Sequence, residues 1–287
     1  MDYKRRDFLK IAGTFASGVA LTGVTAQLTA CHPSSKLSGK NNTFGLQLYS
    51  LRDDLPRDPK GILKQVASFG YKQIEGFEGP KGIYWGMTNT EFKSYMDDLG
   101  MKMVSSHCNW KQGLEKKADE AAAIGMKFLM CPYLGPQKSV DLYKKAADDF
   151  NKAGLICKQR GIKFAYHNHD YSFKMLDGQY PQDILMQNTD KDLVDFELDM
   201  YWIVAAGQDA NVWFKKYPGR FKLGHVKDRG GKETTTLGKG NIDYPTLLKT
   251  AQKAGMEYFI VEQEQYEGTT PLAAAKDDAE YMKLLSI

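Results

Sequence analysis

Four of the five histidines in this chain stand near the ends of short apolar segments, where imidazoles can take part in chemistry. They are His107, His167, His169 and His225. The fifth, His32, lies in a polar stretch rich in serine, lysine and asparagine. An imidazole can ligate a metal ion or exchange a proton near neutral pH. A single histidine at such a place is usually packed or hydrogen-bonded, whereas four in comparable places indicate one shared site.

Carboxylates accompany these histidines in two further apolar segments. Residues 194–199 read Val-Asp-Phe-Glu-Leu-Asp, so acidic and apolar side chains alternate with the period of two that a β-strand imposes. The apolar face of a barrel strand meets outer helices, so we expect the acids to point inward, with Asp199 nearest the C-terminal end. Residues 259–264 place Glu262 and Glu264 on one face, although a solvated loop would suit Glu264. Buried acids are costly unless they are paired or bind a metal.

These residue types predict one divalent metal ion as cofactor. Imidazoles and carboxylates without thiolates suit Mn²⁺, Zn²⁺, Co²⁺ or Mg²⁺. Cys108 and Cys131 also stand near segment ends, but as separate small residues they fit packing. The four cysteines form no CxxC pair and no disulfide framework.

The elements that position these residues alternate between short strand-like runs and longer helical patterns, which is typical of repeated βα units. Expected strands cover residues 43–50, 72–78, 102–108, 127–133, 163–169, 193–200, 221–227 and 257–264. Expected helices cover residues 59–69, 88–99, 111–125, 139–160, 181–188, 209–216, 244–254 and 271–285. A glycine follows five of these helices directly before a strand, as helix C-caps often do: Gly70, Gly100, Gly125, Gly161 and Gly255.

Eight strands with eight helices predict a single (β/α)8 TIM barrel, whose catalytic residues come from the C-terminal ends of its strands. An open sheet is disfavoured because no GxGxxG motif follows the first strand, and there is no P-loop. The length of 287 residues, with 42% hydrophobic and 26% charged residues, suits one such domain. The net charge of +4 is spread out, so no nucleic-acid partner is expected.

The first 30 residues are predicted to be an export signal outside the fold. A charged start is followed by an apolar, small-residue run from Ile11 to Ala30. The string Arg5-Arg6-Asp7-Phe8-Leu9-Lys10 resembles the twin-arginine export motif. A membrane-spanning anchor is the alternative, but the many Gly, Ala, Thr and Ser residues make this run a weak spanning helix.

The signal ends in Leu28-Thr29-Ala30-Cys31, which resembles a bacterial lipobox. The resemblance implies cleavage before Cys31 and lipidation of its sulfur. Residues 31–42 then read as a flexible tether, and residues 43–287 as the barrel. The expected location is therefore periplasmic, with an N-terminal lipid anchor in a bacterial membrane.

At the candidate site residues the chain resembles the sugar isomerase/epimerase group of the xylose isomerase-like barrels. Seven segments match in family order and cover nearly all of residues 43–287: 47–52, 74–75, 166–170, 198–202, 225–228, 238–243 and 261–263. The resemblance implies a metal held by one residue from each of strands five to eight. Those residues are His167, Asp199, His225 and Glu262.

Strand five departs from the family pattern. Many members have glutamate where His167 stands, and there the glutamates of strands five and eight shuttle the proton. Histidine in this place does not favour simple two-glutamate epimerisation. A histidine-rich strand five resembles instead the inosose dehydratase branch, which eliminates water from a keto-inositol. His169 faces the same way as His167, so either can be the ligand, and His169 can also be a base.

The remaining candidates are expected around the mouth of the barrel. The candidate bases are His169, His107 and Glu262. Lys227 follows His225 on the same strand face and can bind an anionic oxygen or polarise a carbonyl; otherwise it is a surface lysine. Glu75 and His107 are expected to contact substrate hydroxyls. Several aromatic residues can offer stacking faces to a sugar or belong to the core: Tyr49, Trp110, Tyr201 and Trp202.

The function predicted is that of a divalent-metal-dependent sugar isomerase or epimerase acting on a free sugar, keto-sugar or glycoside. It abstracts a proton next to a carbonyl through a metal-bound enediolate. The alternative is a lyase or dehydratase that eliminates a β-substituent from a keto-sugar or keto-glycoside. A non-catalytic sugar-binding lipoprotein is a third reading. An apurinic endonuclease of the same superfamily is disfavoured, because it needs several metals and a DNA-binding surface.

Overall fold

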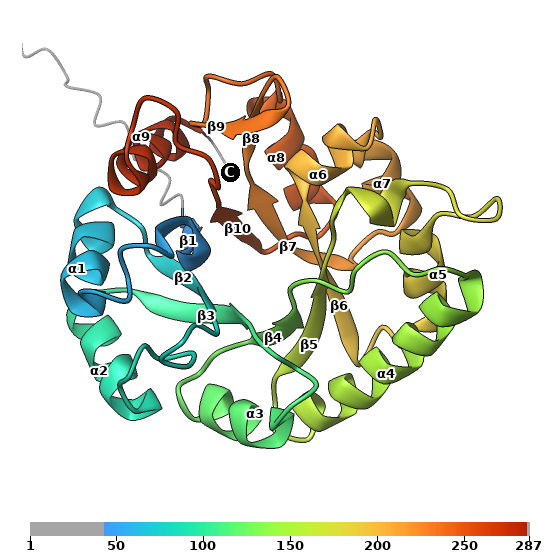
Figure 1. Ribbon diagram of the computed structural model, residues 1–287, viewed down its shortest axis with the longest axis horizontal. Coiled ribbons are helices and arrows are strands. Elements are labelled where there is room, and N and C mark those ends of the chain that lie inside the picture. The colour runs from blue at the N-terminus through green and yellow to red at the C-terminus, as the bar shows by residue number, and fades with distance from the viewer. Residues whose placement is uncertain (1–42, 286–287) are drawn as a thin grey trace, which may run out of the picture. The chain divides into compact units, whose positions relative to one another are not determined.

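A closed ring of eight parallel strands is the centre of the computed structural model, which describes residues 43–285 (Figure 1). Around the ring the strand order is β1-β10-β7-β6-β5-β4-β3-β2, so neighbours in the barrel follow each other in the chain apart from an inserted hairpin. The strands are β1 (Gly45–Gln47), β2 (Gln73–Phe77), β3 (Lys102–His107), β4 (Phe128–Cys131), β5 (Lys163–His167), β6 (Val194–Asp199), β7 (Phe221–Val226) and β10 (Tyr258–Val261). The predicted (β/α)8 fold is confirmed.

The eight predicted helices surround this ring, and their ends lie within three residues of those expected. They are α1 (Pro59–Phe69), α2 (Asn89–Asp98), α3 (Leu114–Ala123), α4 (Val140–Lys158), α5 (Pro181–Asn188), α7 (Ala210–Lys216), α8 (Tyr244–Lys253) and α9 (Pro271–Leu284). Local signals fix their ends. Thr88 and Glu91 form a reciprocal capping box at the start of α2, and Gly70 ends α1 with a φ of 105°.

Successive side chains of each strand point alternately outward to the helices and inward to the barrel interior. The outward residues, such as Phe196 and Leu198 on β6, join the large core between strands and helices. Inside the barrel a small apolar cluster contains Ala165 and Leu223. These two residues precede His167 and His225 by two positions and therefore share their inward face. The interior thus has an apolar layer below and a polar layer at the C-terminal ends of the strands.

Several short elements of the structure were not predicted. The chain turns into a 3-10 helix, η1 (Leu48–Leu51), directly after β1, where a longer strand was expected, and the Gln47 side chain accepts from the Tyr49 amide at that turn. The others are η2 (Asp170–Phe173), α6 (Met200–Ala205) and the hairpin strands β8 (Asp228–Gly230) and β9 (Glu233–Thr235). The hairpin follows β7 at the mouth.

The predicted signal peptide, Cys31 and the tether all fall within residues 1–42, outside the described residues. Over the part of the chain that the structure describes, no helix has the length and apolar character needed to cross a membrane.

Candidate active site

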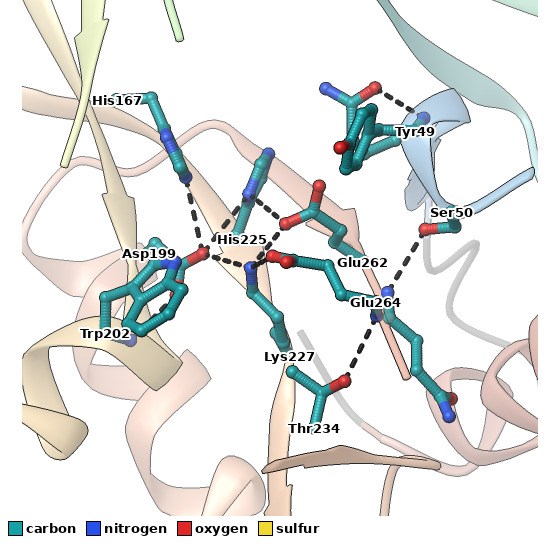
Figure 2. A network of polar contacts seen from close by, with 12 residues as sticks. Tyr49, Ser50, His167, Asp199, Trp202, His225, Lys227, Thr234, Glu262 and Glu264 are labelled. Atoms are coloured by element: carbon teal, nitrogen blue, oxygen red, sulfur yellow. Dashed lines mark hydrogen bonds and ion pairs between the residues drawn. The ribbon is translucent and has the colours of Figure 1, made fainter. Parts of the chain in front are cut away.

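The four predicted metal ligands come together at the C-terminal end of the barrel. His167 and Asp199 end β5 and β6, His225 lies in β7, and Glu262 directly follows β10. Each offers one ligand atom, and these four atoms lie within 4.8 Å of one another in a buried group. Figure 2 shows the side chains pointing toward a common centre.

Two carboxylate oxygens face two imidazole nitrogens in this group. Asp199 Oδ2 lies 3.3 Å from His167 Nε2 and 3.5 Å from His225 Nδ1. Glu262 Oε2 lies 3.1 Å from the same His225 Nδ1. Burial alone would raise the pKa of Asp199 and of Glu262, but neighbouring cations, Lys227 first, lower both well below their usual range. Both side chains are therefore ionised.

In His167 and His225, the ring nitrogen that faces away from the ligand group is hydrogen-bonded to an oxygen acceptor and therefore carries a proton. His167 Nδ1 lies 3.1 Å from the Pro132 carbonyl, which can only accept, so Nδ1 is the donor. His225 Nε2 lies 2.8 Å from Glu75 Oε1, while His225 Nδ1 is buried without a hydrogen bond to any described residue. His225 Nδ1 faces the carboxylates of Asp199 and Glu262; burial would lower the pKa of His225, but these carboxylates together with Glu197 raise it well above its usual range. A divalent ion would take the place of the proton on His225 Nδ1, with Pro132 and Glu75 as the outer hydrogen-bonded partners of the two histidines.

Lys227 belongs to this site and is completely buried, so the surface-lysine alternative is wrong. Its Nζ lies 2.8 Å from Asp199 Oδ2, 2.5 Å from Glu262 Oε2 and 2.6 Å from Glu264 Oε1 (Figure 2). Burial would lower the pKa of Lys227, but these carboxylates raise it well above its usual range. The lysine therefore contributes a fixed ammonium beside the candidate metal ligands.

A second buried group lies against His225 and comprises Glu75, His107 and Glu197. His107 Nε2 lies 3.1 Å from a carboxylate oxygen of both Glu75 and Glu197. Burial would lower the pKa of His107, but the two glutamates raise it to about 9. Glu75 also accepts from Gln47 and Ser105. The structure thus places Glu75, expected at the substrate, below the mouth as a fully buried partner of His225.

The two groups together hold an excess of negative charge. Their buried carboxylates are Glu75, Glu197, Asp199 and Glu262, and their cations are Lys227 and the His107 imidazolium. In the metal-free protein the His225 imidazole adds a further positive charge, because Glu197 and Glu262 raise its pKa well above its usual range, and a divalent ion bound at Nδ1 would replace that proton. Burial and the neighbouring Glu75 raise the pKa of Glu197, which shows that this excess acts within the group.

Comparison with known proteins gives the same family as the sequence motifs. The family model described as xylose isomerase-like TIM barrel matches residues 63–285. The chain belongs to this family.

The names of the proteins related to this xylose isomerase-like barrel give more than one activity. Inosose dehydratase of Clostridium perfringens is 30% identical over 162 residues, which cover 49% of this chain and 54% of that protein. The chain thus spans about half the length of the curated relatives it matches. A solved structure of a sugar phosphate isomerase/epimerase from Parabacteroides distasonis has 30% identity and a TM-score of 0.78, covering 88% of this chain and 98% of that one. The IOLI protein with a bound zinc atom shares the fold at 15% identity, with a TM-score of 0.66 over 83% of this chain and 95% of that one.

A pocket of about 630 Å³ opens above the buried groups of this xylose isomerase-like barrel. Its reactive end is formed by side chains from three strand ends, those of β3, β5 and β10: His107, His167, His169, Glu262 and Glu264. Aromatic residues form other parts of its wall: Tyr49, Phe77, Trp110 and Tyr133. Trp202 does not line it, because its ring packs against His169 at a centroid distance of 5.3 Å.

His169 stands in the pocket wall as an uncharged imidazole. Burial, aided by the neighbouring His167, lowers the pKa of His169 to about 3. His169 Nδ1 has no hydrogen-bond partner among the described residues. Its ring stacks on Tyr171 at a centroid distance of 5.8 Å, which fixes its orientation. It is therefore available to accept a proton or to bind a substrate hydroxyl.

The segment after β10 separates this pocket from a second one. Glu262 and Glu264 line the active-site pocket, whereas Gln263 and Gln265 line a polar pocket of about 640 Å³ beside the hairpin. Thr234 on β9 holds the segment: its Oγ1 accepts from the amides of residues 264 and 265 at 3.1 and 2.9 Å. The hairpin thereby positions Glu264, a partner of Lys227 that the sequence offered only as an alternative.

Proposed function

We propose that this barrel is a divalent-metal-dependent enzyme that removes a proton from the carbon beside the carbonyl of a sugar-type substrate, as an isomerase or epimerase does. One observation carries the proposal: two histidine nitrogens and two ionised carboxylates converge at the floor of a pocket. The residues that would hold the ion are His167, Asp199, His225 and Glu262. A divalent ion bound there would polarise the carbonyl and make the adjacent C–H bond more acidic.

The chain provides both proton acceptors and proton donors around the reacting carbon. Glu262 and His169 line the pocket, and both lack a proton at neutral pH. His107 also lines the pocket but is held as an imidazolium by two glutamates, which suits a donor rather than the base considered above. Lys227 does not line the pocket, but its ammonium pairs with Glu262 and keeps that carboxylate ionised.

Elimination is the second candidate reaction, and the histidines favour it. After the first proton is removed, loss of a β-hydroxyl or β-alkoxyl group requires a proton for the departing oxygen. The His107 imidazolium can supply that proton, and its ring lies 5.1 Å from that of His167 across the same pocket. The relatedness to inosose dehydratase agrees with such a reaction.

Solvent exchange tests the shared first step. Protein loaded with Mn²⁺, Zn²⁺, Co²⁺ or Mg²⁺ is incubated with keto-sugars and keto-glycosides in D₂O. Deuterium is expected beside the carbonyl in an isomerised product or in recovered substrate. If elimination leaves no deuterium in the product, substrate deuterated at the carbon beside the carbonyl should react more slowly than the unlabelled substrate. Product analysis then separates isomers from unsaturated products.

The Asp195→Asn variant should retain the exchange of the wild-type protein. Asp195 lies on the inward face of β6, like Asp199, but at the end of the strand away from the site. Turnover with neither solvent exchange nor an isotope effect would contradict proton abstraction. Binding of sugars without any turnover would support the sugar-binding alternative instead.

A further inference from the structure

Two tyrosines in the pocket wall are exposed: Tyr49 lies in η1 after β1, and Tyr133 follows β4. Tyr133 is 59% exposed and Tyr49 is 40% exposed, although both line the cavity. Tyr133 makes edge contacts with His169 at 4.9 Å and with Tyr171 at 5.7 Å between ring centroids. The Tyr133 ring is therefore fixed beside the reactive end while most of the residue remains uncovered. Such a ring offers a flat apolar surface with a polar tip, which a sugar or aromatic ring can cover.

The charge of the pocket wall does not suit a phosphate group. Its carboxylates are Glu78, Glu262 and Glu264, and Lys111 is its only lysine or arginine. Lys111 Nζ lies over the Trp110 ring, 5.3 Å from the centroid. Phosphate recognition normally uses several charged or backbone donors, arginine above all. Glu78 is paired with Lys117, and Glu262 and Glu264 are paired with Lys227, so away from the reactive end Lys111 is the one cation among the described lining residues that can meet a phosphate group.

The size of the pocket exceeds the needs of one sugar ring. A volume of about 630 Å³ lies in the range of pockets that enclose drug-sized ligands. A single ring held against His167 and Glu262 would leave the exposed Tyr133 ring in contact with water. A second ring would cover that apolar surface and gain the free energy of its burial.

We propose that the substrate is an uncharged glycoside, with its reacting sugar at the histidine end and its second ring, sugar or aromatic, against Tyr133. This inference rests on the proposed function only in stating which of the two rings reacts. It concerns the binding of the second ring, and binding measurements test it. It excludes a sugar phosphate as the preferred ligand, although a similar solved protein bears that name.

The test is calorimetric titration of metal-loaded protein with matched ligands. For each of several hexoses, the free sugar, methyl glycoside, phenyl glycoside, glucosyl disaccharide and 6-phosphate are compared. For at least one hexose, the phenyl glycoside or the disaccharide is expected to bind about tenfold more tightly than the methyl glycoside, the scale of a well-placed aromatic contact. The 6-phosphate is expected to bind no more tightly than the free sugar.

Variants locate the second ring. Tyr133→Ala should weaken binding of the two-ring ligand about tenfold more than binding of the methyl glycoside, and Tyr133→Phe should retain the advantage. Val212→Ala, at an equally exposed residue of α7 outside the pocket, is the control. An unchanged melting temperature of Tyr133→Ala shows that the fold is intact.

The proposal is overturned if no two-ring ligand binds more tightly than its methyl glycoside, or if the 6-phosphate binds most tightly and Lys111→Met abolishes that binding. Failure of the solvent-exchange experiment leaves this ranking intact, because titration needs no turnover. Conversely, exchange on a free keto-sugar without any two-ring preference would uphold the reaction and reject the glycoside.

Discussion

At the scale of single residues, the histidines differ in what their second nitrogen contacts. A carbonyl fixes His167, a glutamate fixes His225, and two glutamates charge His107, whereas His169 Nδ1 contacts no hydrogen-bond partner among the described residues. One residue type thereby provides candidate ligands, a donor and an acceptor within one pocket. The difference comes from neighbours far away in the chain, such as Glu75, which lies 150 residues from His225.

Removal of a candidate ligand should remove the metal. Asp199→Ala and His225→Ala each leave an incomplete set of ligands, so elemental analysis should find little metal in either protein. Glu75→Gln replaces the charged acceptor of His225 Nε2 and should weaken metal binding by roughly 10- to 100-fold. Asp195→Asn should retain the metal of the wild-type protein. Wild-type metal content in both ligand variants would reject the assignment.

His107 should make the stability of the metal-free protein depend on pH. The pKa of His107 is raised to about 9 in the folded chain, against about 6.5 when unfolded. Its stabilising contribution is therefore fully present below about pH 6.5 and is lost as the pH rises through about 9, with a size of about 3 kcal/mol. His107→Gln should thus be less stable than wild type at pH 6, and the gap should narrow by pH 9.5.

Urea denaturation across this range measures the two free energies of unfolding. A gap that stays constant with pH would show that His107 is uncharged in the folded protein.

At the scale of elements, the hairpin β8–β9 connects three parts of the mouth. It follows Lys227 directly, Thr234 binds the segment after β10, and the Tyr201 hydroxyl of α6 donates to the Lys232 carbonyl at 2.6 Å. The Asp228 carboxylate accepts from the amides of Gly238 and Gly240 and so closes the loop that follows. The hairpin therefore holds Lys227 and its partners Glu262 and Glu264 in position.

Thr234→Val should weaken the attachment of the segment after β10 to the hairpin. The change keeps the shape of the side chain but leaves the amides of residues 264 and 265 without their acceptor, at a cost of about 1–3 kcal/mol. Faster amide hydrogen exchange is expected over residues 262–266, together with lower turnover. Thr234→Ser keeps the hydroxyl and should behave as wild type. Equal exchange in the two variants would mean that the threonine hydroxyl does not hold the segment.

The barrel elements were predictable from the sequence because each carries its own local signal. Alternation and glycine C-caps marked eight strands and eight helices within three residues of their observed ends. The helix α6 was not predictable: its Met-Tyr-Trp-Ile-Val-Ala run directly continues an apolar strand. The hairpin is too short to show a periodicity.

For the site, alternation showed which side chains point inward but not how deep they lie. His167, Asp199, His225 and Glu262 were therefore selected together, whereas Glu75 was expected one layer too high. The inward position of Glu197 was foreseen, but its pairing with His107 depends on contacts between β3 and β6. Ser105 gave no signal, and Gln47 stood out only as the first residue of a segment that matches the family, because both obtain their role from Glu75.

At the scale of the whole molecule, we propose that the barrel is exported and anchored by a lipid on Cys31. The proposal rests on the twin-arginine string and the lipobox alone, which lie outside the described residues. Mass spectrometry of protein from cells should find a mature chain that begins at a lipid-modified Cys31. Cys31→Ser should prevent lipidation and release the protein from the membrane fraction. An intact, unmodified N-terminus in cells would reject the prediction.

The segment after β10 has a consequence for how its length can vary. Because Glu262 and Glu264 face one pocket and Gln263 and Gln265 the other, a single inserted or deleted residue there would exchange the two sets of side chains. Two glutamines would then stand at the reacting carbon, and two carboxylates would lose Lys227. Changes of two residues would keep the sides but detach the segment from Thr234. Natural relatives that share this chemistry should therefore show substitutions here but no change in length.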